Sequence, residues 1–123
     1  GWEAWINYAE DHQRLLQAIR RHRADGLVCI SGDTHYAEIS RLDTNAPYPL
    51  WDFTSSGLTE VWPVTPRNAR RIGPALRENN FGLISIDWFA ARPSMLLQAI
   101  DVSGVPRLEQ RIYLDSLRVA ASV

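Results

Sequence analysis

Residues 27–42 read LVCISGDTHYAEISRL, and the order of apolar and turn residues in this stretch decides the fold. Leu27 to Ile30 is a short continuous apolar run between a glycine and Ser31-Gly32-Asp33. Such a run is typical of a strand that is buried on both faces, so we expect it to be central in a sheet. Residues Ala37 to Leu42 alternate weakly, which indicates a second strand, and the turn residues 43–47 end it.

An amphipathic helix is predicted upstream, over residues 2–23. Its apolar residues recur at spacings of three and four with charged residues between them, namely Trp2, Trp5, Ile6, Ala9, Leu16 and Ile19. Arginines in the last turn suit the negative end of a helix dipole, and Asp25-Gly26 is a stop signal.

Extended segments dominate the rest of the chain. Pro49 to Thr54 resumes an extended pattern, and three further runs follow at Phe81 to Trp88, Ser94 to Asp101 and Arg107 to Leu114. Residues 55–80 hold glycine and proline among polar residues, which predicts irregular backbone with room for one short helical turn. A loop of this length in a compact domain is more often functional than idle. The order of elements predicts an α/β (α+β) fold, a mixed sheet with helical cover on at least one face.

The composition excludes several classes of protein. An apolar fraction of 46% is typical of chains that bury a core, which argues against a disordered tail. With 13 basic and 14 acidic residues the formal net charge is −1, so no overall field would attract nucleic acid or an anionic membrane. No apolar run approaches the roughly 18 to 20 residues that span a bilayer. The single cysteine, Cys29, cannot form an intrachain disulfide, and its apolar neighbours predict a small buried side chain.

The loop after the first predicted strand carries the chemistry. Asp33 and His35 lie two residues apart, so in an extended loop both side chains project to the same side and can meet one metal ion. The crevice beyond the strand ends is also the usual ligand site of open α/β sheets. A metal ion needs about four to six donors, however, and the chain offers no second compact cluster of His, Asp and Cys. On spacing alone, an aspartate that caps loop amides beside a surface histidine is the simpler interpretation.

Several motifs together resemble one family. Residues 27–42 resemble the loop in which PhoD-like phosphatases and phosphodiesterases, of the calcineurin-like metallophosphoesterase superfamily, carry their last metal-binding motif, Ser-Gly-Asp-x-His. In the wider superfamily this place is held by Gly-His-x-His. The likeness extends to Trp5-Ile6-Asn7-Tyr8 and Leu15-Leu16 upstream, and to residues 54–59 (TSSGLT) and 80–84 (NFGLI) downstream. It therefore covers nearly the whole chain, with the motifs in the right order.

The resemblance implies a metallophosphatase-type sandwich with two mixed sheets face to face, helices outside and a dinuclear metal centre at the strand ends. His35 would be a metal ligand, and Asp33 a ligand or a group that touches bound phosphate, so both are candidate catalytic residues. The family's earlier motifs, which supply a bridging aspartate and further ligands, would precede Gly1. Residues 1–123 are then expected to be the C-terminal portion of the domain, with the N-terminal half absent. The two divalent or trivalent ions could be Fe, Ca, Mn or Zn.

The activity that the resemblance implies is metal-assisted hydrolysis of phosphate mono- or diesters, of the alkaline phosphatase or phosphodiesterase type. Residues 1–123 alone should be inactive, and metal should be lost as the pH falls and His35 takes up a proton. Uncovered apolar surface should lead to self-association. The alternative is a non-catalytic binding or structural module that retains the fold. The resemblance also implies export or a periplasmic location, and this chain itself shows no signal peptide.

Other polar residues have simpler interpretations. Glu38 could orient His35, but a solvent-facing glutamate at a strand edge is the simpler interpretation. His12 and His22 are expected on the helix surface. The three hydroxyl residues Ser55, Ser56 and Thr59 are poor candidates for a nucleophile and better ones for hydrogen-bond donors that line the crevice.

The arginines and tryptophans of the second half of the chain also leave two interpretations each. Four arginines in the irregular segment could hold the second substituent of a phosphodiester, and a solvated basic face is the simpler account: Arg67, Arg70, Arg71 and Arg77. Trp51, Trp62 and Trp88 are expected in the core or at a domain contact rather than in a platform that stacks on bases.

Overall fold

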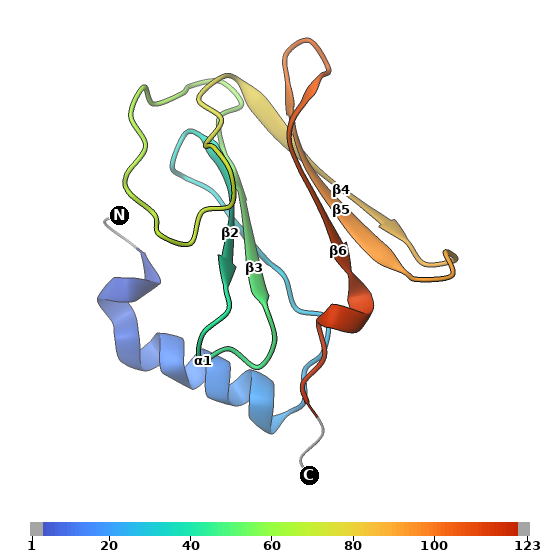
Figure 1. The fold of residues 1–123 in the computed structure, drawn as a ribbon. Helices are drawn as coiled ribbons and strands as arrows, with labels where there is room; N and C mark the ends of the chain where they lie inside the picture. The colour runs from blue at the N-terminus through green and yellow to red at the C-terminus, as the bar shows by residue number, and fades with distance from the viewer. Residues whose placement is uncertain (1–3, 121–123) are drawn as a thin grey trace.

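The protein contains two three-stranded sheets and a helix, as shown by a computed structural model that describes residues 4–120 (Figure 1). The elements in chain order are the 3-10 helix η1 (Trp5–Tyr8), α1 (Ala9–Arg21), β1 (Cys29–Ser31), β2 (Ala37–Leu42), β3 (Leu50–Ser55), β4 (Asn80–Asp87), β5 (Ser94–Asp101), β6 (Pro106–Tyr113) and the 3-10 helix η2 (Leu114–Ser116). In Figure 1, α1 runs below the lower end of the first sheet, and the second sheet stands beside the first on the right. The predicted α/β (α+β) class, with strands and helical cover, is confirmed.

The helical region is divided where a single helix was predicted. Residues 2 and 3 lie outside the described residues, Trp5–Tyr8 form η1, and α1 runs from Ala9 to Arg21. Leu16 and Ile19 are the buried residues of α1, whereas Trp5 is 49% exposed and Tyr8 is 53% exposed. The spacing of apolar residues therefore predicted the helix, but the aromatic residues at its start do not enter the core.

The first sheet is mixed, with the order β1-β3-β2. β3 pairs with β1 in parallel and with β2 antiparallel. The prediction of a central strand at residues 27–30 is wrong: β1 begins at Cys29 and is an edge strand of the described sheet, and Ile30 is 72% exposed. Leu27 and Val28 pack against the core from the segment before the strand. An apolar run indicates burial of side chains, but it carries no information about which edges of the strand are paired.

The second sheet, β4-β5-β6, is antiparallel throughout. Two mixed sheets were expected, and only the first sheet is mixed. The second sheet approaches the first where Gly82 of β4 faces Phe53 of β3. A Cβ atom on Gly82 would lie 3.0 Å from Phe53 Cε1 and 3.0 Å from Ser55 Cβ, so the missing side chain permits this close approach. Phe53 and Leu97 are fully buried between the sheets, together with Leu117 after η2.

Residues 56–79 are irregular, as predicted, and contain no helical turn. Two isolated β-bridges hold this segment against β2: Leu76 pairs with Ala37, and Arg71 pairs with Ser40. The Trp62 backbone N–H also donates to the His35 carbonyl oxygen at 3.0 Å. The segment therefore returns to the loop that follows β1.

The β5–β6 hairpin is closed by Asp101, a side chain that the sequence did not single out. Its Oδ1 accepts hydrogen bonds from the backbone N–H groups of Ser103 (2.8 Å) and Val105 (3.0 Å), and its Oδ2 accepts one from Arg107 Nε at 2.7 Å. The bond from the Val105 N–H is the largest cause that lowers the pKa of the Asp101 carboxyl, and the other two partners add to it.

Replacement of Asp101 by asparagine should therefore lower the unfolding temperature at neutral pH. A lowered pKa in the folded state means that the ionised form stabilises the fold above the unfolded pKa of about 3.9, and that this stability is lost as the pH falls through the folded pKa. The difference between wild type and D101N should thus be largest at neutral pH and should shrink below about pH 4. Thermal unfolding across this range is the measurement, with D43N as control because Asp43 meets Arg41 at an exposed position. An equal difference at every pH would contradict the role of the charge.

Candidate functional site

The loop between β1 and β2 carries both residues that the sequence singled out. The prediction assumed an extended loop, but residues 33–36 form bends. Asp33 (φ +65°) and His35 (φ +54°) both have left-handed backbone conformations. Side chains two residues apart in such a loop do not follow the alternation of an extended chain. Left-handed non-glycine residues are uncommon and cluster at functional sites, so the loop is held in an unfavourable conformation by its surroundings.

Ser56 supplies much of what holds the loop. Its Oγ accepts hydrogen bonds from the backbone N–H of Thr34 at 3.1 Å and of His35 at 3.0 Å. Its own N–H donates to the Tyr36 carbonyl oxygen at 3.3 Å. The sequence had marked Ser56 as a hydrogen-bond donor that lines a crevice; in the structure its hydroxyl donates to the Tyr36 carbonyl oxygen at 3.5 Å and accepts the two loop N–H groups.

The His35 imidazole lies between an indole and a carboxylate. Its ring stacks on Trp62, with centroids 5.6 Å apart and an angle of 24° between the planes. Nδ1 is buried and has no hydrogen-bond partner, and the nearest carboxylate oxygen, Glu60 Oε2, lies 3.7 Å away. An enclosed nitrogen cannot reach an external ion, so Nε2 is the atom through which this ring can bind a ligand. The side chain is 31% exposed, which leaves part of the ring open to solvent.

A cluster of hydroxyls around a carboxylate lies at the end of β1. Ser31 Oγ donates to Asp52 Oδ1 at 2.6 Å and lies 2.7 Å from Thr54 Oγ1. Burial raises the pKa of the Asp52 carboxyl, although the hydrogen bonds from the two hydroxyls act against this shift. Burial is the larger cause that raises the pKa of the Cys29 thiol, and the Asp52 charge adds to it. Cys29 is half-buried and packs against the core, so the predicted buried side chain is confirmed only in part. The sequence did not single out Asp52, and its alternation with Thr54 on one strand is the signal that could have found it.

Glu38 was expected to face solvent, but its side chain is buried. It does not orient His35 either. Its residue is 7% exposed, its Oε2 lies 2.5 Å from Arg71 Nε, and its Oε1 accepts a bond from Asn68 Nδ2 at 2.7 Å. Arg71 pairs with Glu38 and is largely buried, so it does not belong to the solvated basic face that was predicted for the four arginines. Arg77 donates to the Pro63 carbonyl oxygen from an exposed position, and Arg67 and Arg70 are exposed.

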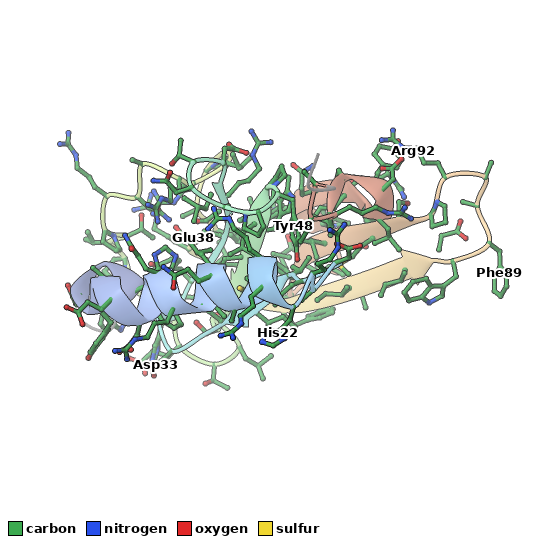
Figure 2. All side chains as sticks on the ribbon, turned by 90° about the horizontal axis from the view of Figure 1, so that it is seen from below. His22, Asp33, Glu38, Tyr48, Phe89 and Arg92 are labelled. Atoms are coloured by element: carbon green, nitrogen blue, oxygen red, sulfur yellow. The ribbon has the colours of Figure 1, made fainter. Side chains whose placement is uncertain are left out.

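The remaining predicted residues are spread over the surface and core. His22 is exposed and His12 is partly buried, with its ring 5.7 Å from that of Trp5. Ser55 donates to Asn80 Oδ1 at 2.9 Å, and Thr59 is exposed. Trp51 is buried, whereas Trp62 and Trp88 are exposed. In Figure 2, Asp33 and the exposed Phe89 lie at opposite ends of the molecule, so the apolar tip of the β4–β5 hairpin is separate from the candidate site.

Asp33 and His35 can supply some, but not all, of the ligands that a metal ion needs. Asp33 is exposed, and the enclosed Nδ1 of His35 lies 3.7 Å from Glu60 Oε2, which is too far for a hydrogen bond but places a carboxylate on the side of the ring away from Nε2. Within residues 4–120, no three side chains of His, Cys, Asp or Glu lie close enough together to hold a metal ion. The loop can therefore contribute ligands, but the described residues do not complete a site.

A match to a family model shows which protein family the chain belongs to. The model described as PhoD-like phosphatase matches residues 1–85 of the 123-residue chain. The chain belongs to the PhoD-like phosphatase family. The matched region contains the loop with Asp33 and His35, the Ser56 turn and the whole irregular segment. Neither a curated protein nor a solved structure matches the chain.

Membership makes this PhoD-like protein a hydrolase of the phosphatase type, in a family whose members are generally metal-dependent. The resemblance that the sequence motifs indicated is thus confirmed. In the described part of the protein, α1 and the other helical segments are too short and too polar to cross a bilayer.

Proposed function

We propose that this chain supplies the last metal-binding loop of a two-metal phosphoesterase that hydrolyses phosphate mono- or diesters. The observation that carries the proposal is the setting of His35, whose Nδ1 is enclosed beside Glu60 while the ring remains partly exposed. Asp33, two residues away and exposed, offers a hard oxygen ligand or a group for the bound phosphate. The other ligands come from residues outside positions 1–123, which would then be the C-terminal portion of the catalytic domain.

In this proposal His35 and its neighbours keep one ring nitrogen available. Nδ1 is enclosed, with Glu60 Oε2 3.7 Å away, so Nε2 is the ring nitrogen that would bind an ion. The Trp62 indole stacks on the ring and adds a contact that limits its rotation. Bound divalent or trivalent ions would supply a nucleophilic water of lowered pKa and would neutralise charge on the phosphoryl oxygens.

The test is metal dependence of the full-length protein. Hydrolysis of p-nitrophenyl phosphate and of bis-p-nitrophenyl phosphate is measured before chelation, after removal of metal verified by elemental analysis, and after addition of Fe, Ca, Mn or Zn. We expect activity to disappear with the metal and to return with one of these ions. A metal-free protein that keeps its rate would refute the proposal. The preferred ester and the restoring ion would define substrate class and metal.

A non-catalytic module is the second candidate, and one observation favours it for this chain alone: no three metal-binding side chains gather within the described residues. Elemental analysis of the purified 123-residue protein, together with the sequence encoded upstream of Gly1, separates the two. An upstream segment with neither Asp-x-His nor an Asn-His-Asp or Asn-His-Glu pattern would favour the module.

The 123-residue protein should self-associate through apolar surface. Ile30 on the edge strand β1 is 72% exposed, Phe81 and Leu83 of β4 are 47% and 42% exposed, and Trp88 just after β4 is 62% exposed. Exposed apolar side chains and an open strand edge are the features that drive association of chains. Sedimentation velocity over a range of concentrations should show dimers or larger species, and I30K should reduce them. A monodisperse monomer at all concentrations would contradict this expectation.

A further inference from the structure

The Ser56 hydroxyl lies where the backbone N–H groups of two successive residues, Thr34 and His35, point to the same place. Because Asp33 and His35 have left-handed conformations, the N–H groups of Thr34 and His35 converge on one acceptor, Ser56 Oγ, at 3.1 Å and 3.0 Å. Thr34 Oγ1 lies 3.4 Å from the same oxygen. The Ser56 side chain, directly after the end of β3, thus accepts hydrogen bonds from the candidate metal ligand His35 and from its neighbour Thr34.

The turn that carries Ser56 is itself fixed. The Asn80 N–H donates to the Gly57 carbonyl oxygen at 2.9 Å, and Asn80 Oδ1 accepts a hydrogen bond from Ser55. Gly57 leaves no room for a side chain, since a Cβ atom there would lie 2.5 Å from Asn80 Nδ2 and 3.3 Å from the Glu78 carbonyl oxygen. Asn80 is 3% exposed. The position of the Ser56 hydroxyl is therefore determined by the buried start of β4.

From these contacts we infer that Ser56 is a positioning residue for His35: it holds the His35 backbone in the left-handed conformation from which the imidazole reaches a metal ion. This inference rests on the proposed function. Ser56 acts through the backbone of His35 and has no contact with substrate. Partners that orient a metal-binding histidine typically change metal affinity or activity by about 10- to 100-fold.

The inference is tested by S56A in the full-length protein, with S103A as the matched control. Ser103 is an exposed serine between β5 and β6, outside the Ser56 turn and the loop that this turn holds. We expect S56A to weaken metal binding by about 10- to 100-fold in a calorimetric titration, and to lower kcat with little change in KM. Amide hydrogen exchange of Thr34 and His35 should accelerate at least about tenfold, since both N–H groups lose their acceptor. S103A should leave the exchange of these two amides unchanged.

S56T is the rescue variant, because threonine keeps an acceptor oxygen on Cβ. It should restore slow exchange and metal affinity to within about threefold of wild type, which a general loss of packing would not do. If S56A does not fold, S56T compared with S56C answers the same question, because a thiol is a weak acceptor. Wild-type metal affinity in a folded S56A or S56C protein would overturn the inference, as would equal losses in S103A.

Failure of the inference and failure of the proposed function give different results. If H35A abolishes metal binding and S56A does not, His35 is a ligand and Ser56 is no positioning residue. If H35A retains metal and activity, the proposed function fails, and the positioning of a metal ligand fails with it, whatever the exchange rates show.

Discussion

Replacement of His35 by alanine is expected to reduce metal-dependent phosphoester hydrolysis by the full-length protein by at least about 100-fold. Loss of a partner that merely orients such a histidine already costs about 10- to 100-fold, so loss of the ligand itself should cost more. The fold should survive the change, because the His35 side chain is partly exposed and its enclosed Nδ1 makes no hydrogen bond that would be lost. The measurement is kcat/KM with the metal that restores activity, together with metal content per chain.

His22 provides the control for this prediction. It is exposed at the end of α1, and H22A should keep both activity and metal content. A parallel D33A variant separates the two roles open to Asp33: lost metal indicates a ligand, whereas retained metal with a raised KM indicates contact with the phosphate. H35A protein with wild-type kcat/KM would refute the role of His35.

Replacement of Arg71 by alanine is expected to destabilise the protein by about 3–5 kcal/mol, which is the usual cost of removing one partner of a buried ion pair. The Glu38 side chain is 9% exposed and that of Arg71 is 17% exposed, so Glu38 would remain as a buried carboxylate without its counter-charge. Only the uncharged donors Asn68 (2.7 Å) and Ser40 (3.4 Å) would still donate to it among the described residues. The loss is large against the roughly 5–15 kcal/mol that hold an ordinary domain together. Urea unfolding at neutral pH measures it.

The neighbouring Arg70 is the matched control, because it is exposed and R70A should change the free energy of unfolding by less than about 0.5 kcal/mol. The double variant E38Q/R71M should recover part of the lost stability, since no buried charge is then left unpaired. Similar losses in R71A and R70A would show that the ion pair contributes no more than a surface arginine does.

The strands were predictable where turn residues flank them and side chains alternate. Ala37–Leu42 and Ser94–Asp101 have the predicted bounds, because Gly, Pro, Asp and Asn lie close to their ends. The position of β1 at an edge was not predictable, since pairing depends on which strand the chain brings beside it. In the same way, nothing local to Glu38 indicates burial: its partner Arg71 follows 33 residues later, in a segment without periodicity.

The candidate site was predictable only in part. The motif with Asp33 and His35 was recognisable because its residues are adjacent in sequence, and the family match over residues 1–85 agrees with it. The left-handed conformations of both residues were not predictable, because they depend on hydrogen bonds to Ser56, which lies 21 residues beyond His35. The same holds for Glu60 and Trp62, which reach the imidazole only because the irregular segment returns along β2.

The most direct test of the central claim is the position of the metal in crystals of the full-length protein. Diffraction data recorded on both sides of the absorption edge of the metal found by elemental analysis would locate each ion by its anomalous signal. We predict a peak about 2.0–2.2 Å from His35 Nε2, with the Asp33 carboxylate beside the same ion or facing the bound phosphate. Peaks that lie elsewhere, with Nε2 of His35 bonded only to protein or solvent, would contradict the account.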